Sequence, residues 1–140
     1  MELETLLATI EARFLIGLAL SVLLGYVIGV EREWRHKDAG ISTHTLVIGG
    51  SMMFTLLSAV VDPLSTSRIA SGIVTGVGFL CAGLILKDGA NVKNLTTAAS
   101  IWFAAAVGMA LGYGFYGIAI IGGLVVALVP RIPNVTREQV

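Results

Sequence analysis

The sequence has little charge. Asp, Glu, Lys and Arg make up only 13% of its 140 residues, against about 25% in an ordinary soluble domain. Hydrophobic residues make up 56%, and this composition excludes an ordinary soluble globule and favours helices that cross a membrane. The net charge is zero, so we expect no nucleic-acid partner. The length allows one domain at most.

The sequence also lacks most groups that would carry chemistry. Its single cysteine, Cys81, excludes an internal disulfide. We find no nucleophile beside a base, no phosphate-binding loop and no metalloprotease helix. We therefore expect a protein that is not an enzyme and has no cofactor. The acidic start, residues 1–5, differs from a secretory signal, so the first apolar run is expected to be retained.

Long apolar runs dominate what is present. The uncharged stretch 95–130 would be about 54 Å long as one helix, far more than a bilayer core of about 30 Å, so we place a break at the glycine and aromatic residues 112–117. A short amphipathic lead, residues 1–13, is expected to rest on the membrane surface. The chain is thus predicted to be an all-α integral membrane protein, a single transmembrane domain with five spans at about 14–30, 45–61, 69–86, 97–111 and 115–129.

Small residues recur every fourth position in two of these spans. Such spacing leaves a groove in which another helix can approach closely. We expect the first and fourth spans to pack together through these two series, which we call the small-residue ladders, and an exposed ladder could also form a homodimer. The first ladder is Gly17, Ser21, Gly25 and Gly29, and the second, which starts at Thr96, includes Ser100, Ala104, Gly108 and Gly112.

The distribution of Lys and Arg predicts the orientation. The loops 31–44 and 87–96 and the C-terminal tail carry seven of these residues, and the other side carries only Arg13 and Arg68. Positive loops stay on the cytoplasmic side. We therefore expect an inner-membrane protein with its N-terminus outside, its C-terminus in the cytoplasm and both polar loops on the cytoplasmic face.

The first polar loop begins directly after the first span. Glu31 lies at the membrane boundary, where a carboxylate needs a partner. Arg35 is better placed than Arg32 to pair with it, because Arg35 lies four residues further along a helix. An ordinary solvated loop anchored by Trp34 is an equally simple interpretation.

A metal site in this loop stays open. His36 and His44 lie near three acidic residues, but without the spacing of a zinc motif. Magnesium would not need that spacing, because it takes one or two carboxylates and keeps its waters. Bound Mg²⁺ is therefore compatible with the sequence but has no support from ligand spacing.

The second polar loop leads into the fourth span. Asn94 or Thr96 is a natural N-cap there, and plain capping is one interpretation. The first-turn amides also favour an anion or an acidic side chain, so Glu31 or Glu33 could pair with this helix start. The candidate polar cluster on the cytoplasmic face comprises Glu31, Arg32, Glu33, Thr43, His44, Lys93, Asn94, Thr96 and Thr97.

Four segments together resemble the MgtC/SapB family. They are 25–33 (GYVIGVERE), 39–47 (AGISTHTLV), 76–83 (GVGFLCAG) and 95–102 (LTTAASIW). They occur in the family's order, and the resemblance covers about residues 14–125. Three positions depart from the pattern: Ser42 stands where the family usually has arginine, and Cys81 and Asn94 stand where it has glycine.

The resemblance implies a small polytopic inner-membrane protein. Known members support growth at low magnesium, are associated with inhibition of the proton-translocating ATP synthase and are not regarded as magnesium transporters. The C-terminal cytoplasmic domain of longer members is not expected here. We therefore expect a regulator linked to magnesium or phosphate stress that binds another membrane protein such as the ATP synthase.

Two other functions compete with this one. The first is a small ion or solute transporter or channel with a polar site at the cytoplasmic helix ends, which charge buried between the spans would favour. The second is a packing subunit of a larger complex.

Overall fold

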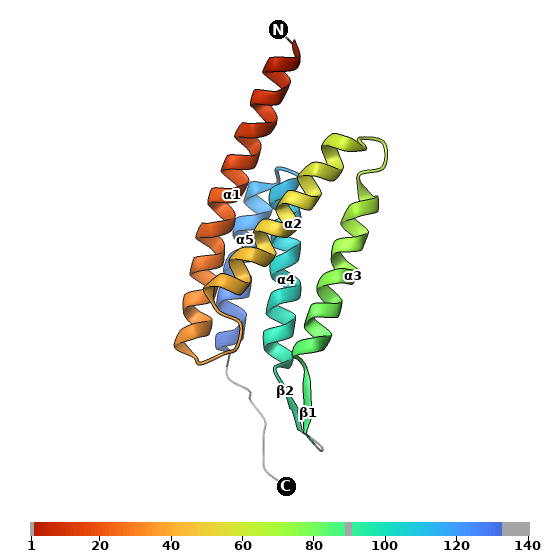
Figure 1. Ribbon diagram of the computed structural model, residues 1–140. Coiled ribbons are helices and arrows are strands. Elements are labelled where there is room, and N and C mark those ends of the chain that lie inside the picture. Colours follow the sequence, from red (N-terminus) through yellow and green to blue (C-terminus); the bar gives the residue numbers. More distant parts are fainter. Residues whose placement is uncertain (1, 89–90, 133–140) are drawn as a thin grey trace.

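The computed structural model describes residues 2–88 and 91–132 as a mainly helical chain (Figure 1). Its helices follow the order of the apolar runs, and an antiparallel hairpin joins the third helix to the fourth. The helices are α1 (Glu2–Trp34), α2 (Ile41–Val61), α3 (Ser67–Leu84), α4 (Leu95–Gly112) and α5 (Tyr116–Leu128); the strands are β1 (Leu86–Asp88) and β2 (Asn91–Lys93), and a 3₁₀ turn, η1 (Val129–Arg131), follows α5.

The all-α class is confirmed. Helices α1 to α4 are each long and apolar enough to cross a membrane. Helix α5 has only 13 residues, about 20 Å of helix, so the count of five spans stays a prediction. The expected break in the last apolar stretch is confirmed, because α4 ends at Gly112 and Gly114 turns the chain with φ +83°.

Two expectations about the ends of the elements are wrong. Residues 1–13 were expected to form a separate surface segment, but α1 continues through them from Glu2 as one helix of 33 residues, about 50 Å long. The third span was expected to reach residue 86, but α3 ends at Leu84 and the chain pairs Leu86 with Lys93 in the hairpin. Arg137 of the tail lies outside the described residues.

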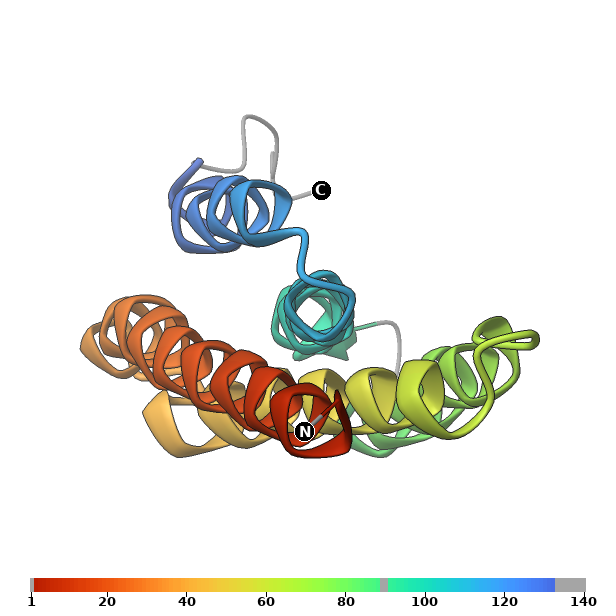
Figure 2. The same cartoon turned by 90° about the horizontal axis from the view of Figure 1, so that it is seen from above.

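Helix α2 lies at the centre of the packing. In the view from above, α1, α2 and α3 lie along one side, α4 lies against them, and α5 lies beyond α4 (Figure 2). The main core between α1, α2, α4 and α5 includes Leu24, Ile28, Ile48, Met52 and Leu111. A second cluster joins α3 to α4.

The small-residue ladders do not face each other, so the expected pairing of the first and fourth spans is wrong. Both ladders pack on α2. A Cβ added at Gly25 of α1 would lie 2.5 Å from Thr45 Cα, and one added at Gly112 of α4 would lie 2.6 Å from the Met52 carbonyl oxygen. The spacing identified the faces that allow close approach, but a repeat of four cannot say which helix fills the groove.

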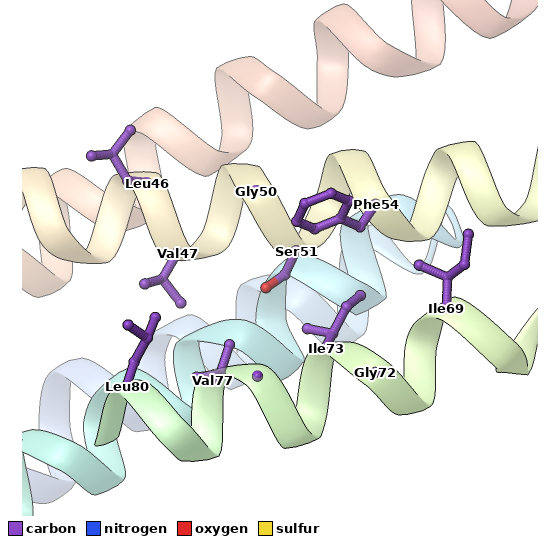
Figure 3. A pocket seen from close by; sticks show the side chains of 11 residues that line it. Leu46, Val47, Gly50, Ser51, Phe54, Ile69, Gly72, Ile73, Val77 and Leu80 are labelled. Atoms are coloured by element: carbon purple, nitrogen blue, oxygen red, sulfur yellow. The ribbon is translucent and has the colours of Figure 1, made fainter. Parts of the chain in front are cut away.

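Helix α3 packs more loosely than the other long helices. A groove of about 660 Å³ runs between α2 and α3. Its walls are almost wholly apolar, with Leu46 and Phe54 on α2 and Ile69 and Leu80 on α3 (Figure 3). This face therefore suits the hydrocarbon region of a bilayer.

Candidate functional site

Arg32 joins the end of α1 to the start of α4. It lies in the last turn of α1, and only 1% of its surface is exposed. Its Nη2 donates a hydrogen bond of 2.8 Å to Thr97 Oγ1, across 65 residues of sequence. No described residue accepts a hydrogen bond from its buried Nε. A buried guanidinium is costly to desolvate, so the bond to Thr97 is central to this end of the bundle.

His44 makes the matching connection between α2 and α4. Its ring is fully buried, with Nδ1 2.9 Å from the Gly40 carbonyl oxygen and Nε2 3.3 Å from Ser100 Oγ. Ser100 Oγ also lies 2.8 Å from the Thr97 carbonyl oxygen. A neutral ring with its proton on Nδ1 donates to Gly40 and accepts at Nε2, so Nε2 and the Thr97 carbonyl compete for one hydroxyl proton.

The first polar loop meets the second at Asn94. The Asn94 side-chain amide donates to Asp38 Oδ2 at 2.6 Å and to the Leu84 carbonyl oxygen at 3.3 Å. Asn94 stands at the N-cap position of α4 but makes no capping bond with its side chain, and its backbone is left-handed, with φ 64°. Beside this contact, Ala39 is buried in one cluster with Ala98. The two polar loops thus meet at this point, at the lower end in Figure 1.

The carboxylates do not pair with the start of α4, so that expectation is wrong. Glu33 Oε1 accepts a hydrogen bond of 2.9 Å from the Ile41 backbone N–H, at the start of α2. Glu31 pairs with Arg35, whose Nε lies 3.4 Å from Glu31 Oε1, as the spacing of four predicted. Successive helical residues point about 100° apart, so when Arg32 faces α4 its neighbours must face elsewhere.

The other candidate residues lie around this cluster. Thr43 is half-buried in the first turn of α2, and Thr96 is exposed beside Thr97. Lys93 is exposed at the end of β2. Within the described residues, no group of three or more His, Cys, Asp or Glu side chains is placed to hold a metal ion.

Sequence reasoning missed two members of the site. Ser100 was assigned only to helix packing, although its hydroxyl contacts His44. Asp38 was considered only as a metal ligand, but it accepts from Asn94. A signal existed for Ser100, because it lies three residues after Thr97 and so on the same face of α4.

The family model for the MgtC family matches residues 18–138. The chain belongs to this family. It is 41% identical over 113 residues to protein MgtC of Salmonella typhimurium, covering 81% of this chain and 49% of that protein. It is 42% identical over 113 residues to protein slr0014 of Synechocystis, covering 80% and 48% of the two chains.

A third relative comes from Escherichia coli K12. It carries the name "Putative magnesium transporter YhiD" and is 44% identical over 130 residues, covering 86% of this chain and 60% of that protein. The chain thus spans about half to three-fifths of the length of these curated relatives. No solved structure matches. Family membership and the four long apolar helices make this a membrane protein.

Proposed function

We propose that the protein is a regulator without enzymatic activity, linked to magnesium or phosphate stress, that binds another membrane protein through its polar end. The observation that supports this most is the junction of the two polar segments. Asn94 bonds to Asp38, and Arg32 bonds to Thr97. Two loops joined by these bonds present one ordered surface. Binding of a partner to an ordered surface costs little conformational entropy, so this arrangement favours binding.

The proposed topology is multi-pass in the inner membrane, with five spans, the N-terminus outside and the polar end in the cytoplasm. The excess of Lys and Arg at the polar end supports this orientation. Helix α5 is short, and a short span can be accommodated by local thinning of the bilayer at modest cost.

The exposed residues at this end suit a protein partner. Trp34 is 85% exposed, and Leu86 and Val92 of the hairpin are exposed beside charged neighbours. Aromatic and apolar groups within a polar rim are typical of protein interfaces. By resemblance to the family, the proposed partner is the proton-translocating ATP synthase. A homodimer through the loosely packed α3 is compatible with this partner.

Photo-crosslinking in cells tests this function. A photoreactive residue placed at His36, in the exposed first loop, should give an adduct with a subunit of the ATP synthase. The same residue at Val61, exposed at the opposite end of α2, should give no such adduct. Equal adducts from both positions, or none from His36 in cells that require the protein at low magnesium, would refute the proposed partner.

A transporter is the second candidate, and one observation favours it. Glu31 and Arg32 are both buried, and ionisable groups buried among spans often mark pathways. Against it, Arg32 is bonded to Thr97, and Ile28 and Ile48 are fully buried in the core that would have to open. We therefore expect liposomes containing the pure protein to show no magnesium, proton or phosphate flux. A flux abolished by Glu31→Gln would reverse the order of the two proposals.

A further inference from the structure

Ser51 carries a buried hydroxyl that lies in the groove between α2 and α3. The residue is 4% exposed and lines this groove. Its hydroxyl has no hydrogen-bond partner among the described residues, and Figure 3 shows the oxygen pointing from α2 into the space between the helices. Ser51 stands midway along α2, about 15 Å of helix from either end. A hydroxyl at this depth of a membrane needs a partner.

One face of α3 is not used within the chain. Gly72 and Gly76 line the groove, and a Cβ at either position would meet nothing within 4 Å. Thr75 and Phe79 are exposed beside these glycines, Phe79 to 81%. Val77, on the other flank of the glycines, is buried in the cluster with α4. Interfaces between membrane helices are rich in small and hydroxyl residues, so the free face of α3 suits a second helix.

The depth of the Ser51 hydroxyl decides between a lipid and a helix as the occupant. A phospholipid has only hydrocarbon at this depth and would leave the hydroxyl without a partner. Helix α3 has a hydroxyl at the right level, because Thr75 lies between Ile73 and Val77, which line the groove together with Ser51. A twofold axis along the membrane normal preserves depth, so it brings Thr75 of a second copy to the level of Ser51.

We propose that the groove is the docking site for α3 of a second copy of this chain, in a twofold symmetric dimer. Gly72 and Gly76 of the two copies face each other and allow close approach of the two α3 helices. The rotation turns the flank that carries Thr75 toward α2 of the other copy, where Ser51 donates to Thr75 Oγ1. This oxygen has free lone pairs, because its own proton is directed to the Ser71 carbonyl oxygen at 3.4 Å.

Phe79 supplies the apolar contact of the same interface. It lies one turn beyond Thr75 toward the polar end of the molecule, on the exposed face of α3. At that end the groove is lined by Val47 and Leu80 (Figure 3), and an aromatic ring that fills such a site buries a large apolar area. The dimer leaves the polar end free, so the proposal stands apart from the proposed regulatory partner.

Disulfide cross-linking between two differently tagged copies tests the contact. In a Cys81→Ala background, one copy carries Ser51→Cys and the other carries Thr75→Cys. Oxidation by copper phenanthroline in membranes should join both tags in one band. Val74→Cys is the matched control, because Val74 is exposed on α3 at the same level but about 100° further round the helix, and it should give no such band with Ser51→Cys. Equal bands from both pairs, or none from the Ser51 and Thr75 pair with both thiols shown to be reactive, would overturn the proposal.

The oligomeric state in liposomes provides a second arm, measured by energy transfer between labelled copies as the protein is diluted in lipid. Gly76→Leu separates the two α3 helices and should weaken association about tenfold. A Cβ at Gly76 meets nothing within one copy, so the unfolding midpoint of the dilute, monomeric protein should match the wild type. Gly117→Leu, on α5, also has open space and should keep the dimer.

Three results would overturn the dimer. The first is a wild type that stays monomeric at every protein-to-lipid ratio, and the second is association that Gly76→Leu leaves unchanged. The third is a native mass spectrum in which the monomer retains one apolar molecule that Ser51→Ala loses, which would assign the groove to a lipid-soluble ligand instead.

Discussion

Arg32 is the largest fully buried side chain among the described residues. Its place in the last turn of α1 is favourable, because a cation there interacts with the partial negative charge of the helix C-terminus. This interaction stabilises a helix by about 0.3–1 kcal/mol. The same guanidinium lies at the positive start of α4, where the helix dipole is unfavourable. The hydrogen bond to Thr97 Oγ1 therefore offsets part of the cost of holding a cation at this position.

Replacing Thr97 by valine tests this bond. Valine keeps the shape but removes the acceptor, so a buried cation loses its partner, at an expected cost of about 1–3 kcal/mol in the free energy of unfolding. Thermal unfolding in detergent should show a lower midpoint for Thr97→Val. The adjacent, exposed Thr96→Val is the matched control and should unfold like the wild type; equal midpoints for both variants would contradict the role of the bond.

Asn94 allows a second test at the same scale. Its left-handed backbone suits glycine, and a residue with a Cβ is disfavoured there by about 1–2 kcal/mol, although Asn tolerates it better than most. Both Asn94→Gly and Asn94→Ala lose the bonds to Asp38 and Leu84, but only alanine adds backbone strain. We expect the alanine variant to unfold at a lower temperature than the glycine variant. Equal stability of the two would show that the backbone conformation is not constrained.

Among the helices, α2 has the central role because the ladders of both α1 and α4 pack on it. Close approach at Gly25 and Gly112 leaves no room for a Cβ, whereas a Cβ at Gly72 or Gly76 of α3 would meet nothing within 4 Å. Glycines with the same spacing thus serve different purposes. In α1 and α4 they permit contact between helices, and in α3 they border the open groove.

Alanine substitutions should separate these two kinds of glycine. Gly25→Ala and Gly112→Ala push the backbones apart, and we expect a cost of about 1–3 kcal/mol each, as for overpacking of a core. Gly72→Ala and Gly76→Ala should be neutral or slightly stabilising, because alanine favours the helix by about 1 kcal/mol over glycine. Thermal unfolding of the four variants in one detergent measures the difference. Similar losses in both pairs would mean that α3 is also tightly packed.

At the scale of the whole molecule, the orientation is testable with cysteines. In a Cys81→Ala background, His36→Cys should react with a membrane-impermeant maleimide only from the cytoplasmic side. Leu64→Cys, at a fully exposed position in the turn between α2 and α3, should react only from the outside. Labelling of both positions from one side would contradict a membrane crossing by α2, and the reverse pattern would invert the proposed topology.

The sequence predicted this molecule best where one local rule decided the outcome. The apolar runs located the helices, the turn around Gly114 separated the last two, and the spacing of four paired Glu31 with Arg35. It failed where the outcome depended on which elements meet. The small-residue ladders identified the packing faces of α1 and α4 but not the helix that packs on them, so the role of α2 was not predicted. The loop sequence also did not show that Arg32, and not a carboxylate, would face Thr97. The short hairpin has no periodic pattern long enough to detect.

An engineered cross-link tests whether the two polar loops meet at Asp38 and Asn94 in the membrane. Asp38→Cys and Asn94→Cys are combined in a Cys81→Ala background, with a protease site inserted at Leu64 to cut the chain between them. After treatment with a short bifunctional thiosulfonate in membranes and proteolysis, the two halves should stay joined on a non-reducing gel and separate on reduction. A control pair of Asp38→Cys with Arg68→Cys, at the far end of α3, should not stay joined. Separation of the halves in the Asp38 and Asn94 pair, with both thiols shown to be reactive, would contradict the account.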